Sequence, residues 1–220
     1  MIDIKNVALS YGTHRVLANF SAHIAQNSIT AIIGRNGSGK STLLSAISGD
    51  IALSGGEIRL HGNSISELSS QELAYLRSYA TQSHTYWMAY PVEEILRMGH
   101  DAVSQERYEY LVDALDIRSI LKQRITTLSG GQLQRVEIAR AFMRDTTLVL
   151  LDEPFAGIDP IAVLDIQKTI KFLAAKNIGV LITDHNVRET LDVCEKAYIV
   201  SHGKLIAEGA PSDILNNEQV

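Results

Sequence analysis

The stretch GRNGSGKST, residues 34–42, holds the residues best suited to chemistry in this chain. It fits the pattern G-x-x-x-x-G-K-[ST] and stands between a β-branched run and a helical pattern, which is the context that this motif requires. The glycines let the backbone curl so that successive N–H groups point at a phosphate. Lys40 then supplies positive charge to β- and γ-phosphates, and the Ser41 hydroxyl can bind Mg²⁺. The alternative, an ordinary glycine-rich turn, would not need this full pattern.

Two carboxylates, Asp152 and Glu153, end the apolar run LVLLDEP. Asp152 falls at the end of a predicted strand, where it can hold a magnesium ion through water. Glu153 points to the opposite side and can reach a water in line with a γ-phosphate. A strand that ends in Asp is common, but the pair Asp-Glu after a matched phosphate loop is more specific. The pair therefore indicates a metal-binding residue next to a base.

A second candidate anion site is the sequence LSGGQ at residues 128–132. Two adjacent glycines follow Ser129 at the start of an amphipathic helix. With Ser129 as N-cap, such a helix start offers backbone N–H groups to an anion. A merely capped helix is the alternative. This second cradle has no lysine of its own, so the motif alone does not say which phosphate it would serve.

The composition limits the class of protein. The chain has 220 residues and a net charge of −5, which suits one large α/β domain and argues against a dedicated nucleic-acid binder. Cys194 is the only cysteine, so no intrachain disulfide can form; we interpret it as a small buried residue in a reducing compartment. Asp3 and Lys5 interrupt any signal-peptide core, and apolar runs stay far below the ~18–20 residues of a membrane span. Work at a membrane would need a partner.

Strands and helices must alternate to position these residues. Strands are predicted at residues 2–9, 20–24, 28–34, 57–62, within 146–154 and at 178–185, with a hairpin at 197–209 that turns at His202 and Gly203. Helices are predicted at 39–49, 69–77, 91–98, 104–122, after 129, at 160–175 and in a last turn after 211. This alternation predicts an α/β fold with a mainly parallel sheet.

We predict a single domain over residues 1–220. Its catalytic core comprises residues 1–67 and 146–220, and residues 68–145, which lack strong strand patterns, form a helical subdomain that carries LSGGQ.

The motifs together resemble those of the ATP-binding subunits of ABC transporters. The phosphate loop, LSGGQ, LVLLDEP and the later ITDH occur in the order and spacing of that family, over essentially the whole chain. The resemblance implies a P-loop NTPase fold with antiparallel N-terminal strands and a helical subdomain, ATPase activity, and ATP and Mg²⁺ as cofactors. It also implies in-line attack of water on the γ-phosphate, with Glu153 as general base.

The resemblance answers the question that LSGGQ raises. In ABC ATPases two subunits pair head to tail, and each nucleotide lies between the phosphate loop of one and the LSGGQ of the other. Ser129 and Gly131 would then bind the γ-phosphate of ATP held by a second copy of this chain, through hydroxyl, backbone N–H and helix dipole.

Four more roles are carried over by matching single positions. Tyr11 in LSYG resembles the aromatic residue that stacks on adenine, and Gln82 in YATQ resembles the glutamine that senses Mg²⁺ and the attacking water. His185 in ITDH resembles the histidine that contacts the γ-phosphate. Asp159 in AGIDP resembles the loop that links two active sites, although AGID departs from the commoner SALD, which leaves its contacts open.

These inferences give the candidate sites. Catalysis is assigned to Lys40, Gln82, Glu153 and His185, and Mg²⁺ binding to Ser41, Gln82 and Asp152. Nucleotide binding is assigned to Tyr11, Arg35, Asn36, Gly37, Ser38, Gly39, Lys40, Ser41, Thr42, Ser129, Gly130, Gly131, Gln132 and Asp159.

The likeness divides between two groups of transporters. Up to about residue 126 the chain resembles the ATPases of iron-siderophore, haem and cobalamin importers, in ELAYLRSYATQ and AYPVEEILRMGH for example. From Leu151 onwards it resembles the bacterial lipopolysaccharide-export ATPase, in LDEPFAGIDPIAVLDIQ. Natural divergence and an engineered fusion with a seam near residues 128–151 are both open at this point.

The resemblance also implies where the chain works. Transmembrane permease subunits are expected to dock near Gln82–Gly99, which would hold the chain as a peripheral protein on the cytoplasmic face of the plasma membrane. No nucleic-acid partner is expected. The alternatives are a non-transport or engineered ABC ATPase that acts as a nucleotide-dependent dimerisation switch, and a catalytically silent module. Intact Lys40, Asp152, Glu153 and His185 disfavour the last.

Overall fold

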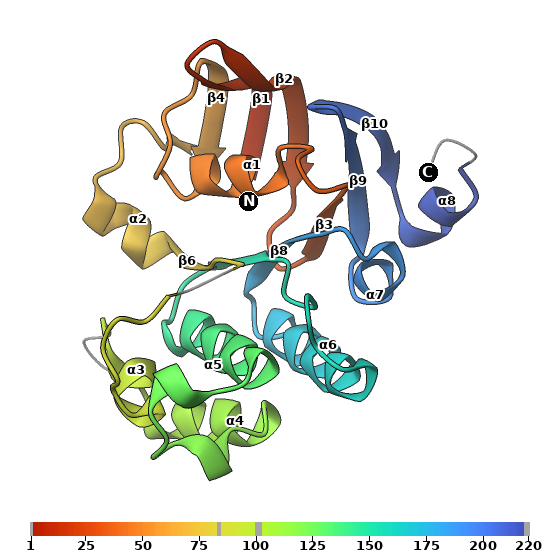
Figure 1. Ribbon diagram of the computed structural model, residues 1–220. Coiled ribbons are helices and arrows are strands. Elements are labelled where there is room, and N and C mark those ends of the chain that lie inside the picture. The colour runs from red at the N-terminus through yellow and green to blue at the C-terminus, as the bar shows by residue number, and fades with distance from the viewer. Residues whose placement is uncertain (1, 83–84, 100–102, 218–220) are drawn as a thin grey trace.

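The computed structural model describes residues 2–82, 85–99 and 103–217 and contains two sheets (Figure 1). The first is antiparallel, in the strand order β2-β1-β4-β5. Its strands are β1 (Ile2–Tyr11), β2 (His14–Ile24), β4 (Gly55–Leu60) and β5 (Asn63–Ser64). β2, at one edge, pairs with β1 only within this sheet.

The second sheet has six strands in the order β10-β9-β3-β8-β7-β6. β9, β3, β8, β7 and β6 run parallel, and β10 pairs with β9 in the antiparallel direction. The bounds are β3 (Ile29–Ile33), β6 (Arg77–Ala80), β7 (Leu148–Asp152), β8 (Gly179–Asp184), β9 (Lys196–Ser201) and β10 (Lys204–Gly209). The carboxyl ends of five parallel strands therefore share one edge.

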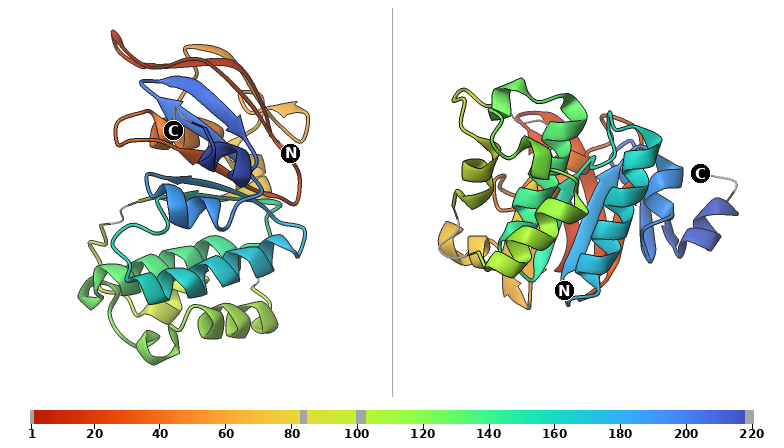
Figure 2. Two further views of the ribbon diagram at one scale, coloured as in Figure 1. Left: turned by 90° about the vertical axis from the view of Figure 1, so that its right-hand side faces the viewer. Right: turned by 90° about the horizontal axis from the view of Figure 1, so that it is seen from below.

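Helices cover both faces of the parallel sheet. The helices are α1 (Lys40–Ile47), α2 (Ser70–Leu76), α3 (Val92–Arg97), α4 (Gln105–Ala114), α5 (Gly130–Met143), α6 (Pro160–Ala174), α7 (Val187–Leu191) and α8 (Pro211–Leu215), with 3₁₀ turns η1 (Arg118–Ile120) and η2 (Ile125–Thr127). α1 lies between the two sheets, while α5 and α6 lie under the parallel sheet with α3 and α4 beyond them (Figures 1 and 2).

Successive residues of the central strands enter two different hydrophobic cores. Leu148 and Leu150 of β7 pack with α1 and the antiparallel sheet, whereas Val149 and Leu151 pack with the helices below. In β8, Leu181 joins the upper core, between its neighbours Val180 and Ile182 in the lower one. Burial on both faces is the reason that these strands read as unbroken apolar runs.

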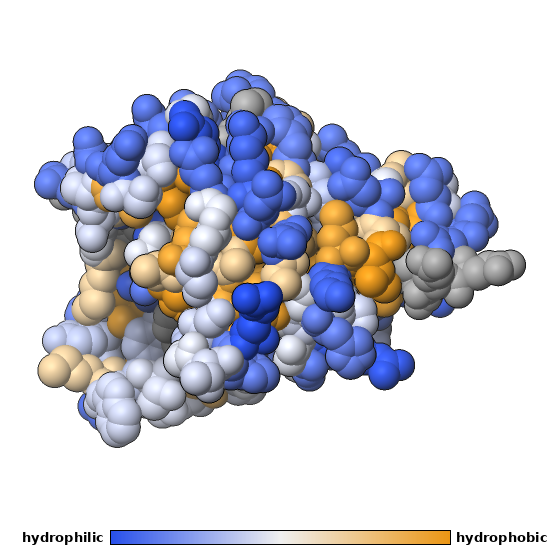
Figure 3. Space-filling view, turned by 90° about the horizontal axis from the view of Figure 1, so that it is seen from above, coloured by the Kyte–Doolittle hydropathy of each residue, from blue (hydrophilic) through white to orange (hydrophobic). Residues whose placement is uncertain are grey.

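The face of the molecule above the antiparallel sheet carries both hydrophilic and apolar residues (Figure 3). In Figure 3, hydrophilic residues predominate around the margin of this face, and apolar residues show between them near its middle. Among the helices that the structure describes, none combines the length and the apolar character that crossing a membrane requires.

The structure confirms the predicted α/β fold with a mainly parallel sheet, antiparallel N-terminal strands and a group of helices. The predicted helix at 104–122 is wrong in its second half, because α4 ends at Ala114 and Asp116 turns the chain with a φ of 51°. The range 68–145 also contains β6, which the sequence did not predict because RSYA is a short, half-buried edge strand. The division into core and helical subdomain stays a prediction.

A tyrosine hydroxyl joins the two sheets. Tyr198 of β9 is fully buried in the upper core, and its ring makes an edge contact with Phe20, at 6.4 Å between ring centroids. Its hydroxyl donates to the carbonyl of His23 at 2.7 Å and accepts from the N–H of His23 at 3.0 Å. His23 lies in the edge strand β2, so Tyr198 satisfies backbone groups that have no strand partner on that side.

We expect Tyr198→Phe to lower the free energy of unfolding by about 1–3 kcal/mol, because both backbone groups of His23 lose their partner. Urea denaturation followed by circular dichroism measures the change. Tyr75→Phe is the matched control, since the Tyr75 side chain is largely exposed. Equal stability of Tyr198→Phe and the wild type would show that the hydroxyl does not hold the sheets together.

Candidate functional site

The phosphate loop leaves the carboxyl end of β3 and enters α1 through positions that need glycine. A Cβ on Gly34 would lie 2.2 Å from the carbonyl oxygen of Val200 in β9, so the loop can pass the neighbouring strand only without a side chain. Gly39, the N-cap of α1, has a φ of 100°, a backbone conformation that is costly for every residue except glycine. The sequence therefore fixes both the exit from the strand and the entry into the helix.

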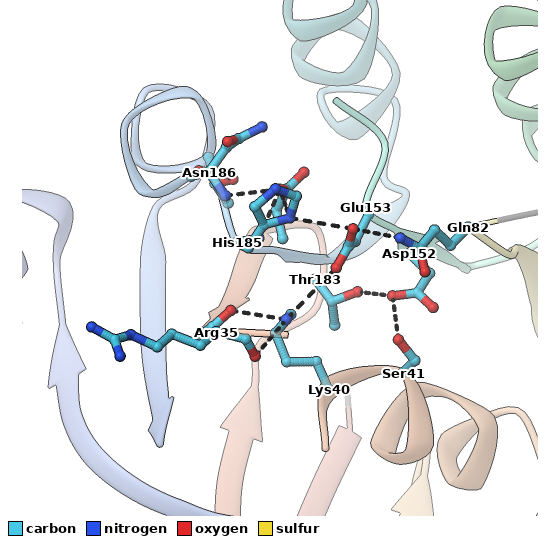
Figure 4. A network of polar contacts seen from close by, with 12 residues as sticks. Arg35, Lys40, Ser41, Gln82, Asp152, Glu153, Thr183, His185 and Asn186 are labelled. Atoms are coloured by element: carbon cyan, nitrogen blue, oxygen red, sulfur yellow. Dashed lines mark hydrogen bonds and ion pairs between the residues drawn. The ribbon is translucent and has the colours of Figure 1, made fainter. Parts of the chain in front are cut away.

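Lys40 turns back into this loop. Its Nζ donates to the carbonyl oxygens of Gly34 at 2.9 Å and Arg35 at 3.3 Å (Figure 4). The side chain is 4% exposed, and its Nζ lies 3.7 Å from Oε1 of Glu153. The ammonium group thus stands between the loop backbone and the carboxylate at the end of β7.

The carboxylate of Asp152 accepts hydrogen bonds from two hydroxyl groups. Ser41 of α1 donates to Oδ1 of Asp152 at 3.1 Å, and Thr183 of β8 donates to the same oxygen (Figure 4). The strand register explains the second contact, because Asp152 pairs with Thr183 across β7 and β8. Ser41 and Asp152 together offer adjacent hard oxygen ligands, the type of donor that Mg²⁺ prefers.

Glu153 is the centre of the polar network. Oε2 accepts from Nε2 of Gln82 at 2.7 Å and lies 3.2 Å from Nδ1 of His185, while Oε1 faces Lys40 (Figure 4). The backbone of Glu153 has a φ of 50°, in the left-handed region, and is fixed there by a 2.7 Å bond from its N–H to the carbonyl of Thr183. A non-glycine residue held in this region is strained, and such strain occurs frequently at functional sites.

Asp184 positions His185. Its Oδ1 accepts from the backbone N–H groups of His185 at 2.7 Å and Asn186 at 2.9 Å, and its Oδ2 accepts from that of Phe155 at 3.4 Å. Burial raises the pKa of Asp184, whereas these backbone bonds act in the opposite direction. The buried carboxyl group therefore holds the turn after β8, from which the His185 ring reaches Glu153.

A cavity of about 420 Å³ opens over this cluster. It is lined by His14, Val16, Asn36, Gly37, Gly39, Lys40, Ser41, Thr42, Gln82 and Glu153. Among the described residues, the hydroxyl oxygen of Ser38 is buried without a hydrogen-bond partner at the base of the same loop. An orphan hydroxyl, a buried ammonium group and a curled loop fit the phosphates of a nucleotide.

LSGGQ lies at a second, smaller cavity of about 250 Å³, lined in part by Ser129, Gly131, Gln132 and Asp159. Ser129 caps α5: its hydroxyl accepts from the N–H of Gln132, and the Gln132 side chain accepts from the N–H of Ser129. Asp159 accepts from the N–H of Ala162 at 3.0 Å in the first turn of α6. None of the described lining residues belongs to both cavities, so the chain presents LSGGQ apart from its own Lys40.

The remaining predicted residues lie around these cavities. Tyr11 is exposed and pairs with His14 across β1 and β2, without lining the first cavity itself. The Arg35 side chain extends away from Lys40 in Figure 4 and lines another hollow, together with His185. Gly130 begins α5, and a Cβ there would meet no neighbour within 4 Å.

Sequence reasoning missed several residues of the site. Thr183 and Asp184 stand at the carboxyl end of β8 within ITDH, so the same strand-end argument that selected Asp152 could have found them. His14 and Val16 line the first cavity because β2 begins at His14, earlier than the predicted strand at 20–24. Their sequence context carries no signal for a ligand.

Comparison with known proteins identifies the family. Residues 17–156 match the family model described as ABC transporter. The chain belongs to the ABC transporter family. Its fold agrees: the structure of a nucleotide-free ATP-binding cassette from an ABC transporter superposes with a TM-score of 0.88 at 26% identity, over 100% of this chain and 96% of that one.

Two curated ABC relatives cover the whole chain. The lipopolysaccharide export system ATP-binding protein LptB of Haemophilus influenzae is 40% identical over 100% of this chain and 95% of its own length. The same protein of Escherichia coli is 38% identical over 100% and 94%. Because the likeness extends over both halves of the chain, the comparisons do not support a fusion of two transporter families. As an ABC family member, the chain binds ATP and is an ATPase.

We expect Thr183→Val to lower the ATPase rate about tenfold or more and to raise the Mg²⁺ concentration needed for half-maximal rate, because Asp152 loses a fixed donor. Phosphate release measured over a magnesium titration tests this. Thr30→Val is the control, since Thr30 is equally buried one strand away and pairs with Leu181 rather than with a carboxylate. Identical magnesium curves for the two variants would contradict the role of Thr183.

Proposed function

We propose that this chain hydrolyses ATP to drive lipopolysaccharide export, acting as a dimer through separate membrane subunits. The observation that carries the proposal is the whole-chain likeness, at 38–40% identity, to ATP-binding proteins of lipopolysaccharide export systems. The cluster around Glu153 supplies the chemistry. The proposal includes attachment to the inner face of the plasma membrane through those subunits.

The first cavity is the proposed ATP site. The residues of the loop from Arg35 to Thr42 surround the phosphates, with Lys40 facing the β- and γ-phosphates and the Ser38 hydroxyl donating to one of them. Tyr11, together with His14 and Val16, is placed on the side of the base, where aromatic stacking contributes ~1–3 kcal/mol. Ser41, Asp152 and Gln82 would hold Mg²⁺, which supplies charge neutralisation to the phosphates when it is bound.

Glu153 is the proposed general base. Its carboxylate accepts a proton from a water that attacks the γ-phosphate in line with the leaving oxygen. Gln82 and His185, both in contact with Glu153, orient this carboxylate and the water. Lys40 stabilises the negative charge that develops on the phosphate oxygens.

The second cavity is the proposed partner half of the site. Ser129, Gly130, Gly131 and Gln132 open α5. The capping pair satisfies the N–H groups of Ser129 and Gln132, so those of Gly130 and Gly131, which have no acceptor within the helix, would face the anion. The helix dipole adds attraction for a γ-phosphate. Because this cavity is separate from Lys40, two copies paired head to tail would complete two ATP sites, with Asp159 beside each junction.

We expect Glu153→Gln to bind ATP, to form a dimer in its presence, and to hydrolyse it about 10²–10⁴ times more slowly than the wild type, since the amide cannot accept the proton. Phosphate release, calorimetric ATP binding and gel filtration with and without MgATP measure the three quantities. Glu189→Gln, on the short helix α7, is the charge-matched control.

Near-normal turnover of Glu153→Gln would remove Glu153 from the role of base. A variant that binds ATP but elutes as a monomer at every protein concentration would instead argue against the shared site.

The proposed docking surface for membrane subunits lies within Gln82–Gly99, of which residues 83–84 are outside the described part of the chain. Trp87 is 91% exposed and Met88 is 64% exposed, a costly arrangement for large apolar side chains unless a partner covers them. At the end of the same range, Met98 and Gly99 line a hollow of about 300 Å³ to which α5 and the residues around β6 contribute three arginines, Arg77, Arg140 and Arg144, and one carboxylate, Glu137. The surface would accept an apolar element with acidic neighbours.

Capture of membrane subunits tests the transport assignment. We expect the tagged chain to retain the membrane subunits of a lipopolysaccharide export system, and not those of an iron-siderophore importer, from detergent extracts that contain both. Trp87→Ala should weaken capture about tenfold or more, as loss of a central aromatic contact does. Leu164→Ala, an exposed residue of α6, is the control. Capture of neither set would favour the alternative of a nucleotide-dependent dimerisation switch.

A further inference from the structure

The segment 85–90, which follows Gln82, has one aromatic side chain turned inward between exposed neighbours. Tyr86 is partly buried and packs against the lower core, whereas Trp87 and Met88 project outward. All three belong to the proposed docking surface. The inward residue is the one that connects this surface to the rest of the molecule.

Tyr86 contacts the helix that begins at LSGGQ. Its hydroxyl donates to Oε1 of Glu137, and Nη1 of Arg140 donates to the Tyr86 oxygen at 3.3 Å. Glu137 and Arg140 are both on α5, and their side chains form an ion pair at 3.9 Å. Burial, with the nearby Glu137 carboxylate, raises the pKa of Tyr86, so the hydroxyl keeps its proton and remains a donor.

Glu137 is only 4% exposed, and Tyr86 and Arg140 are among the groups that compensate its buried carboxylate. Taking an ionised group out of water is expensive unless hydrogen bonds and an opposite charge compensate for it. A displacement of Tyr86 would therefore remove one hydrogen-bond donor from a buried charge, which costs free energy. α5 and segment 85–90 are consequently expected to move together.

The chain before and after this segment is anchored as well. On its N-terminal side Gln82 donates to Glu153 at 2.7 Å. At its other end the carbonyl of Tyr90 accepts from the N–H of Ile125 at 2.9 Å, and the N–H of Val92 donates to the carbonyl of Gln123 at 3.0 Å. Contacts at Gln82, Tyr86 and Tyr90 thus lie, in turn, on the proposed base, on the helix of LSGGQ and on residues just before LSGGQ.

We propose that Tyr86 is a positioning residue whose hydroxyl ties the docking segment to α5, so that nucleotide binding and contacts at Trp87 are energetically coupled. The inference rests on the proposed function, because it takes the first cavity as the ATP site. Coupling of this kind is reciprocal: if nucleotide changes the free energy of the docking segment, a partner on that segment changes nucleotide affinity by the same factor.

The chain offers its own probe, because Trp87 is its only tryptophan. The experiment adds the nonhydrolysable analogue AMP-PNP with Mg²⁺ to the full chain and records Trp87 emission and its quenching by acrylamide. Isothermal titration calorimetry measures the affinity for AMP-PNP independently of fluorescence. We expect a saturable Trp87 response in the wild type whose midpoint matches the calorimetric affinity.

In Tyr86→Phe we expect calorimetric affinity within about twofold of the wild type, with the Trp87 response reduced to less than half. Tyr90→Phe is the matched control in the same segment; it should keep the full response, because Tyr90 is anchored through its backbone carbonyl. Glu137→Gln should also keep most of the response, since the amide oxygen still accepts from Tyr86.

Each outcome decides a separate claim. If AMP-PNP does not bind to the wild type, the proposed function fails. If it binds without a Trp87 response, or if Tyr86→Phe keeps the full response, the inference alone fails. Hydrogen exchange of the wild type gives a test that needs no variant. When nucleotide is added, the protection of residues 85–90 and that of α5 should rise in parallel. Independent changes in the two segments would overturn the coupling.

Discussion

Glu153 carries a carboxylate that is almost completely buried, and a buried charge is stable only when neighbouring groups donate to it or carry the opposite charge. Three parts of the chain meet this requirement: Lys40 from the phosphate loop, Gln82 after β6, and His185 after β8. Two of these, the phosphate loop and Gln82, also line the first cavity together with Glu153 itself. Satisfying one carboxylate therefore also assembles the polar face on which a phosphate can lie.

The parallel sheet makes this meeting possible. Its strands are covered on both faces, so polar side chains have room mainly where the strands end, and in parallel strands those ends lie along one edge. Asp152, Asp184 and the phosphate loop all leave from this edge, at β7, β8 and β3. The antiparallel sheet closes the opposite side of α1 and brings His14 and Val16 to the cavity.

Local motifs predicted the parts of the site that depend on few neighbours. Lys40, Ser41, Asp152 and Glu153 follow from a phosphate loop and a strand that ends in carboxylates, and the structure brings them within contact distance. Gln82 has no local pattern and came only from family resemblance, whereas His185 also stands at the polar end of an apolar strand. The Ser129 cap was also predicted, because an N-cap is decided within four residues.

Other features could not be predicted because they depend on contacts between distant residues. The left-handed backbone of Glu153 is imposed by Thr183, 30 positions later, and no propensity of glutamate favours it. β6 owes its strand conformation to pairing with β7 rather than to RSYA. The inward direction of Tyr86 depends on Glu137, in a helix whose packing no local pattern specifies.

Because the central strands are buried on both faces, their apolar side chains only weakly specify the register in which the strands pair. If β7 slipped by one residue, Leu148 and Leu150 would exchange places with Val149 and Leu151, apolar for apolar, so the hydrophobic pattern alone resists the slip only weakly. The polar contacts at the strand end do distinguish the two alignments, because Asp152 would leave Ser41 and Thr183. Groups selected for chemistry thereby also discriminate against a misaligned sheet.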